Sequence, residues 1–145
     1  MPTRAQLSAI EADTEDHTPL MRAALVGDTE TVKLLVAKGE DVNAQDHEGR
    51  TALMFAVINM HTDTVKALLD LGADVNVRAN DGGTALMLAA TCGDEEIARL
   101  LLDKGADVNG RYVATGQTAA DLAAEKGHAA IIALLKAAGA DITAR

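Results

Sequence analysis

The chain has no tryptophan, one tyrosine and one phenylalanine, so aromatic rings can contribute little to a core. Hydrophobic residues nevertheless make up 48% of its 145 residues. The packing must therefore come from Leu, Val, Ile and above all Ala, whose small side chains let helices approach closely. This composition is typical of one globular domain rather than of a disordered chain.

Basic residues are also few, because 13 Lys and Arg stand against 22 Asp and Glu and give a formal charge of −9. Nucleic-acid binding depends on a basic surface that neutralises phosphates, and this balance argues against it. The single cysteine, Cys92, excludes an intramolecular disulfide and is compatible with a reducing compartment.

No apolar run approaches the ~20 residues that span a bilayer, and the first residues lack the apolar core of a signal peptide. We therefore expect a cytoplasmic protein without a membrane partner. Glycine-rich phosphate loops, paired-cysteine motifs and His-Glu-x-x-His helices are absent from the sequence. We accordingly expect no enzyme activity, no cofactor and no metal.

A repeat fills most of the chain. One tetrapeptide register recurs in steps of 33, 33 and 34 residues, and a second marker that begins with glycine keeps the same step. The first marker stands at 18–21, 51–54, 84–87 and 118–121, and the second at 39–43, 72–76, 105–109 and 139–142. Two markers in phase indicate one supersecondary element repeated along the chain.

Each repeat is predicted to contain two helices joined by a tight turn and followed by an extended finger. Thr18 can cap the first helix and Pro19 suits its first turn, since proline has no N–H to lose there. Gly27 supplies the turn, and Asp28 can cap the second helix. Gly39 suits a left-handed position at the end of the second helix.

These motifs resemble the ankyrin repeat family, whose Thr-Pro-Leu-His, Gly-His and Gly-Ala-Asp-Val-Asn elements are matched over residues 18–143, with Met in place of His. The resemblance implies an all-α solenoid of four stacked helix-turn-helix units with short β-hairpin-like fingers and a concave groove that holds other proteins. The expected repeats are 18–50, 51–83, 84–117 and 118–143, within a domain of residues 18–145. Residues 1–17 are expected to form a tail or a short helix.

Polar residues at three repeat positions indicate where the array ends. Arg22 replaces an apolar residue of the first helix, Asp121 interrupts the row of methionines, and Lys136 replaces an apolar residue of the second helix. Repeat arrays need polar outer faces on their terminal repeats. We therefore expect a complete, monomeric array of four repeats, in which the remaining methionines of that row belong to the core.

One turn departs from the pattern, because Met60 stands where Gly27, Gly93 and Gly127 stand in the other repeats. A left-handed backbone there disfavours any residue with a Cβ atom. Either Asn59 takes the strained conformation, or contacts hold Met60 in it.

Other candidate chemical groups have structural explanations. His61 and His128 both follow the turn between helices, where histidines of the resembled family serve the local turn. The acidic stretch 94–96 lies at the start of a second helix, where carboxylates interact favourably with the helix dipole and with the free N–H groups.

Partner-binding residues are expected at finger tips and on the exposed side of the first helices, because stacking fixes neither. The candidates are Arg50, Ile58, Arg78, Asn80, Asp81, Thr91, Cys92, Arg111, Tyr112 and Val113. Arg50, Arg78 and Arg111 place one guanidinium on each successive finger and could grip carboxylates of a partner. Alternatively, these arginines only pair with neighbours such as Glu48 and Asp81.

The third finger holds one residue more than the other fingers and contains the only tyrosine, Tyr112. Tyrosine is enriched at binding hot spots, so this finger is a candidate contact. Alternatively, the extra residue is a tolerated surface insertion and Tyr112 lies back on its own finger. The sequence therefore predicts a module that binds another protein. A structural or self-associating scaffold is the alternative, and an enzyme or metal protein that uses the acidic groove is a weaker one.

Overall fold

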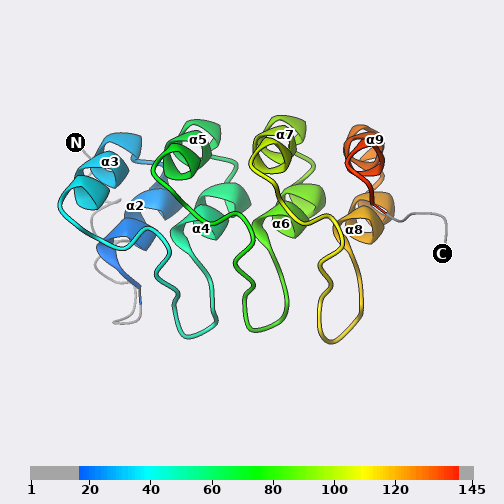
Figure 1. The fold of residues 1–145 in the computed structure, drawn as a ribbon, viewed down its shortest axis with the longest axis horizontal. Helices are drawn as coiled ribbons and strands as arrows, with labels where there is room; N and C mark the ends of the chain where they lie inside the picture. The colour runs from blue at the N-terminus through cyan, green and yellow to red at the C-terminus, as the bar shows by residue number, and fades with distance from the viewer. Residues whose placement is uncertain (1–16, 141–145) are drawn as a thin grey trace. The chain divides into compact units, whose positions relative to one another are not determined.

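The computed structural model describes residues 17–140, which form eight α-helices and no β-strand (Figure 1). In chain order the helices are α2 (Pro19–Val26), α3 (Thr29–Ala37), α4 (Ala52–Ile58), α5 (Thr62–Asp70), α6 (Ala85–Cys92), α7 (Glu95–Asp103), α8 (Ala119–Lys126) and α9 (Ala129–Ala137). The prediction of an all-α fold is confirmed. The expected N-terminal tail, apart from His17, and the last residues of the expected fourth repeat lie outside the described residues.

The chain divides into two compact units, residues 1–74 and 75–145. In the first unit α2 packs against α4 and α3 against α5, and in the second α6 packs against α8 and α7 against α9 (Figure 1). Consecutive helices of each helix pair also contact each other. Each unit is therefore a stack of two helix-turn-helix elements, with like helix on like helix.

Every first helix begins at a threonine whose hydroxyl accepts a hydrogen bond from a backbone N–H three residues later. The four caps are Thr18, Thr51, Thr84 and Thr118. The predicted roles of Thr18 and of Pro19 in the first turn are confirmed. In α8 the Asp121 carboxylate also accepts from the N–H of Thr118 at 3.0 Å, which completes a capping box. Asp121 therefore has a local role beyond the expected polar outer face.

The core consists mainly of aliphatic and small side chains, and Phe55 adds an aromatic ring to it in the first unit. Met21, Met54 and Met87 are at most 2% exposed, so the prediction that they belong to the core is confirmed. A row of equivalent alanines is equally buried: Ala23, Ala56, Ala89 and Ala123. Small residues at these positions allow neighbouring helices to pack closely.

The turn between the two helices of a pair takes a left-handed backbone. Gly27 has φ of 77°, and Asp28 then caps α3 by accepting from the N–H of Thr31 at 3.1 Å, as predicted. The equivalent Met60 has φ of 56°, whereas Asn59 keeps φ of −94°. Met60, and not Asn59, therefore carries the strained conformation.

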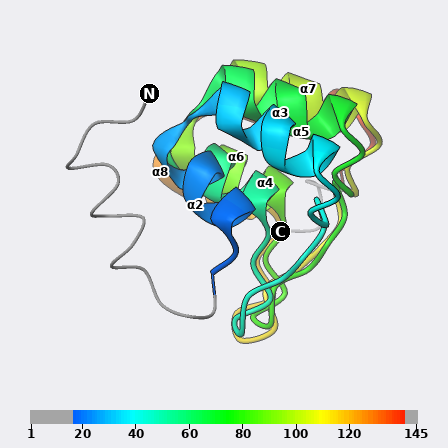
Figure 2. The same cartoon turned by 90° about the vertical axis from the view of Figure 1, so that its left-hand side faces the viewer.

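A finger loop follows the second helix of each of the first three pairs, and we name the three loops by residues 45–50, 78–83 and 111–117. Figure 2 shows the first finger loop projecting away from α2 and α4. Backbone hydrogen bonds close the loops, from Asp46 N to Arg50 O (2.9 Å), Ala79 N to Gly83 O (2.9 Å) and Tyr112 N to Gln117 O (3.0 Å). These loops have a hairpin-like course that consists of turns and bends, and residues 17–140 contain no β-strand.

Candidate partner-binding site

The second and third finger loops, both in the second unit, are hydrogen-bonded to each other. The N–H of Val113 donates to the carbonyl oxygen of Asp81 at 2.8 Å. The guanidinium of Arg78 donates through Nη2 to the carbonyl oxygen of Arg111 at 3.0 Å. Five of the predicted site residues are thereby brought together: Arg78, Asp81, Arg111, Tyr112 and Val113.

Gly82 allows this close approach of the two loops. Its φ is +87°, and a Cβ atom at this position would overlap the carbonyl oxygen of Arg111 and lie 3.1 Å from the nitrogen of Val113. Gly82 was not among the residues predicted to shape the site, although the Gly82-Gly83 pair is visible in the sequence. Paired glycines in a loop indicate a place where another backbone comes near.

Tyr112 lies against the second finger loop. A Cβ atom on Gly83 would be 3.0 Å from Cε1 of Tyr112 and 3.6 Å from its hydroxyl oxygen. The ring therefore does not lie back on its own finger alone, and it is half-buried. Burial raises the pKa of Tyr112, and the negative charge of Asp81 adds to this effect. The phenol consequently remains a hydrogen-bond donor at neutral pH.

The extra residue of the third finger loop lies at its tip. The hydrogen bond that closes this loop joins residues 112 and 117, which are five apart, whereas the closing bonds of the other two loops join residues four apart. Val113 at this tip is 76% exposed, more than any other large hydrophobic side chain of the described residues. Ala114 and Thr115 beside it are exposed as well. An apolar side chain thus projects from the tip next to the half-buried tyrosine.

Arg78 and Arg111 occupy equivalent repeat positions and are both exposed. Arg111 donates through Nη1 to the carbonyl oxygen of Gly116 at 2.9 Å, just as Gln45 in the first loop donates to Gly49 O at 2.9 Å. In these two hydrogen bonds Arg78 and Arg111 donate to backbone carbonyl oxygens and not to carboxylates. Asn80 is exposed in the second finger loop between Arg78 and Asp81.

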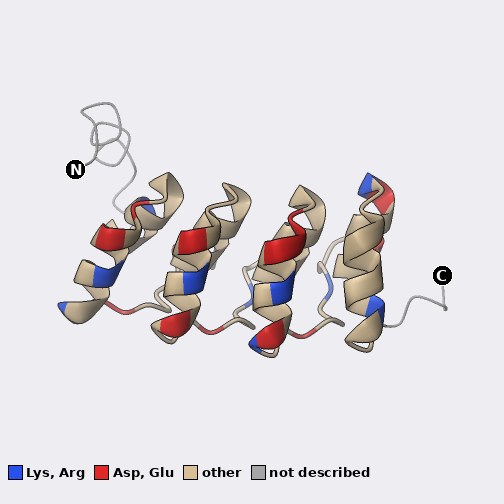
Figure 3. Cartoon of the chain, turned by 90° about the horizontal axis from the view of Figure 1, so that it is seen from above, with Lys and Arg blue, Asp and Glu red and all other residues tan. Residues whose placement is uncertain are grey.

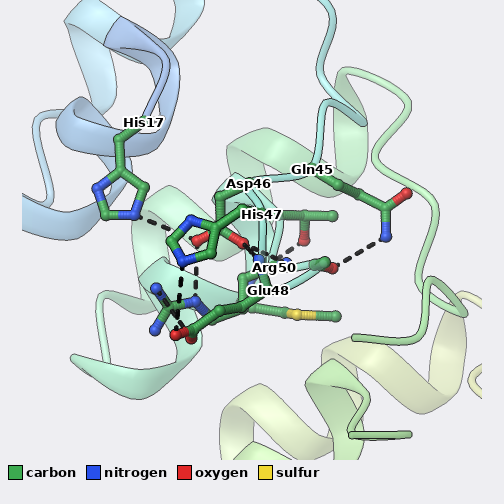
Figure 4. Close-up of polar contacts among 9 residues, drawn as sticks. His17, Gln45, Asp46, His47, Glu48 and Arg50 are labelled. Atoms are coloured by element: carbon green, nitrogen blue, oxygen red, sulfur yellow. Dashed lines mark hydrogen bonds and ion pairs between the residues drawn. The ribbon is translucent and has the colours of Figure 1, made fainter. Parts of the chain in front are cut away.

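Arg50 differs from these two arginines, because acidic side chains of its own loop surround it (Figure 4). Its Nε lies 2.9 Å from Asp46 Oδ2 and its Nη2 lies 3.2 Å from Glu48 Oε2. Its guanidinium carbon is 5.0 Å from the centre of the Phe55 ring, within cation–π range. The structure therefore shows Arg50 paired with acidic neighbours, Asp46 and Glu48, which was one of the two expectations for these arginines.

Asp46 is the centre of this cluster, and its carboxylate is fully buried. Burial raises its pKa, but hydrogen bonds from the backbone and side chain of Arg50, the charge of Arg50 and the N–H of Glu48 outweigh burial, so the pKa lies below its ordinary value. His17 Nε2 also lies 3.2 Å from Asp46 Oδ2. Asp46 therefore ties the first finger loop to the residue that precedes α2.

The groove candidates lie apart from the finger loops in sequence, at the ends of first helices. Ile58 ends α4 and is 39% exposed, and the hydroxyl of Thr91 donates to the carbonyl oxygen of Met87 at 3.1 Å. Cys92 is half-buried at the end of α6. Burial raises the pKa of the Cys92 thiol, and the charge of Asp94 raises it further. The thiol is therefore protonated and weakly nucleophilic at neutral pH.

The two turn histidines act on the preceding helix pair, which corrects the expectation that they serve the local turn. Neither His61 nor His128 makes a side-chain capping bond to its own helix. His61 Nε2 instead lies 3.0 Å from Leu25 O, and its ring is so near Gly27 that a Cβ atom there would be 2.7 Å from Nδ1. A Cβ atom on Gly93 would meet the ring of His128 at 2.5 Å.

Acidic and basic residues alternate along α5 and α7 (Figure 3), whereas Lys136 is the one charged residue within α9. Asp94 caps α7 by accepting from the N–H of Ile97 at 3.1 Å, and Glu95 pairs with Arg99 at 2.6 Å. These contacts confirm the structural interpretation of the acidic stretch 94–96. No group of three or more His, Cys, Asp or Glu within residues 17–140 is placed to hold a metal ion. None of the helices described for this chain has the length and apolarity to cross a membrane.

Comparison with family models gives one match, described as ankyrin repeats (3 copies), over residues 4–79 and 74–145. Comparison with curated proteins gives no match. Ankyrin repeats are generally protein–protein interaction modules, and repeats of this type are typically non-catalytic.

Proposed function

Because the chain belongs to the ankyrin repeat family, we propose that it is a monomeric protein-binding module that holds another protein through its finger loops, without catalysis of its own. The observation that carries the proposal is the exposed tip of the third finger loop. Val113 projects from it at 76% exposure, beside the half-buried Tyr112, and the exposed Arg78 and Arg111 belong to the same two hydrogen-bonded loops.

The side chains at this tip suit complementary parts of a protein surface. Tyrosine and arginine are enriched at hot spots, since they bury much area and also donate hydrogen bonds. Tyr112 is held by the neighbouring loop, so its ordering on binding costs little side-chain entropy. Val113 supplies an apolar contact that excludes water from the interface at the tip.

Arg78 and Arg111 give the site its charge preference. Their guanidinium groups are positively charged within a chain of formal charge −9, so an approaching carboxylate meets attraction here and repulsion over much of the remaining surface. Arginine binds carboxylates in a planar, bidentate way. Asn80, Asp81, Thr91 and Cys92 of the second unit are further proposed contact residues, and so are Arg50 and Ile58 of the first unit.

Affinity capture tests the proposal and identifies a partner. The full chain is immobilised and incubated with native lysate, in parallel with the triple variant Arg78→Ala/Arg111→Ala/Tyr112→Ala. Arg99→Ala removes an exposed arginine from α7 and serves as the matched control. We expect proteins that bind the parent and the control but not the triple variant. If every captured protein binds the triple variant as well as the parent, the finger site is wrong.

A further inference from the structure

The turn between α4 and α5 exposes a methionine on a backbone conformation that suits glycine. Met60 has φ of 56° and is 53% exposed. Hydrogen bonds from Met60 N to Val57 O at 3.0 Å and from His61 N to Ala56 O at 2.9 Å hold the turn in place. Glycine would remove the strain without disturbing these bonds. The methionine side chain therefore adds little to folding, and strain at an exposed residue points to function.

A second exposed apolar side chain lies close by. Ile58, two residues before Met60, is 39% exposed. Asn59 Nδ2 donates to Leu25 O at 3.1 Å and His61 Nε2 lies 3.0 Å from the same oxygen, so the end of α2 holds the turn. Ile58 and Met60 thus expose apolar side chains at a turn that is held in place by Asn59 and His61, and methionine adapts readily to different binding partners.

An acidic hollow begins at the next residues of the same turn. It has a volume of about 230 Å³ and is lined by Gly27, Thr29, His61, Thr62, Asp63 and Thr64. Asp63 is its one carboxylate, and within residues 17–140 no basic side chain forms an ion pair with it. The neighbouring hollow between α3 and α5 shares Asp63 and holds Glu30 and Asp70 as well as Lys33 and Lys66. A cation that enters this hollow therefore finds the carboxylate of Asp63, beside Thr62 and a buried Thr64 whose hydroxyl is hydrogen-bonded to that of Thr29 at 2.8 Å.

We propose that Ile58, Met60 and Asp63 form a second docking site, for a protein segment that carries an apolar side chain next to a lysine or arginine. The apolar side chain contacts Ile58 and Met60, and the basic side chain enters the hollow toward Asp63. Charge complementarity selects this occupant, because the site offers a carboxylate where the finger loops offer guanidinium groups. The inference rests on the proposed protein-binding function in general, but not on the finger loops.

A peptide library displayed on phage, selected on the immobilised full chain, tests the proposal. Enriched peptides are synthesised with a fluorophore, and their dissociation constants are measured by anisotropy for the parent and for Met60→Gly, Asp63→Asn, Leu34→Ala and Tyr112→Ala. Leu34 is 54% exposed on α3 and provides a matched apolar control. We expect a class of peptides that combines an apolar residue with a neighbouring Lys or Arg and binds both Met60→Gly and Asp63→Asn about tenfold more weakly.

The control variants separate this site from the finger loops. The same peptides should bind Leu34→Ala and Tyr112→Ala as tightly as they bind the parent. Melting temperatures of all variants are measured in parallel, and Met60→Gly is expected to melt no lower than the parent, so unfolding cannot account for lost binding. The proposal is overturned if no enriched peptide depends on Met60, or if Met60-dependent peptides bind Asp63→Asn with unchanged affinity. Enrichment only of peptides that require Tyr112 would also overturn it, while supporting the finger site.

Discussion

The contact between His61 and Gly27 gives a stability prediction that has an internal control. In Gly27→Ala, the new Cβ would lie 2.7 Å from Nδ1 and 2.8 Å from Cγ of the His61 ring, and the backbone would keep φ of 77°. The left-handed conformation costs about 1–2 kcal/mol for a residue with a Cβ atom. Displacing the ring adds about 1–3 kcal/mol for overpacking and for weakening its contact with Leu25 O. We therefore expect a destabilisation of about 3 kcal/mol.

Gly127→Ala is the matched control for this change. Gly127 occupies the equivalent turn with φ of 75°, and a Cβ atom there would meet nothing within 4 Å. This variant should lose only the backbone contribution, about 1–2 kcal/mol. Gly27→Ala made in a His61→Ala background should approach the same smaller cost, and the double-mutant cycle then measures the contact between ring and turn.

Urea unfolding followed by far-ultraviolet circular dichroism measures these differences, since the chain has no tryptophan to report on folding by fluorescence. If the His61 ring occupies the space beside Gly27, Gly27→Ala must be clearly less stable than Gly127→Ala. Equal losses in the two variants, or a Gly27→Ala loss that His61→Ala does not reduce, would refute the role assigned to His61.

Three further predictions concern single residues. Met60→Gly should raise the free energy of unfolding by about 1 kcal/mol, because it removes left-handed strain from a half-exposed side chain; an unchanged or lower melting temperature would contradict this. The pKa of Asp46 is lowered in the folded state, so its contribution to stability should be complete above its ordinary value of 3.8 and disappear as the pH falls through the lower folded value. Urea titrations between about pH 2 and 5 should show a weaker acid dependence for Asp46→Asn than for the parent, and equal slopes would count against the role assigned to Asp46. Cys92, whose thiol pKa is raised, should react with iodoacetamide more slowly than free cysteine at pH 8, as mass spectrometry can follow, and an equal rate would contradict this prediction.

The helices were predictable from the sequence because their signals are local. Thr18 and Asp28 form their caps within three residues, and Gly39 with φ of 99° ends the helix that precedes it. Each of these positions is specified by backbone sterics and by hydrogen bonds to neighbouring residues. The repeat then allowed the interpretation of one pair to be transferred to the others.

The site was less predictable because its geometry depends on contacts between repeats. Arg50 was grouped with Arg78 and Arg111, but it stands at a different repeat position and lies in the ion pairs of Asp46 and Glu48. His61 was assigned to its own turn, whereas its ring packs on a residue 34 positions earlier. The contact of His61 involves a partner in another repeat, which the sequence of one repeat does not contain, whereas the ion pairs of Arg50 lie within its own loop.

The orientation of Tyr112 also depends on a contact between two repeats. The extra residue and the tyrosine were visible in the sequence, but the direction of the ring depends on Gly82 and Gly83, which let the third finger loop approach the second. Paired glycines in one finger together with an insertion in the next would have been the signal for this contact.

The central claim is that the finger loops hold a partner protein, and an equilibrium titration tests it most directly. A partner obtained by capture is titrated in a calorimeter with the parent, Arg78→Ala, Arg111→Ala, Tyr112→Ala and the control Arg99→Ala. A hot spot in the finger loops predicts that at least one of the three finger variants loses about 2 kcal/mol or more of binding free energy, roughly thirtyfold in affinity, while Arg99→Ala binds like the parent. Parent-like affinity in all three finger variants would contradict the claim.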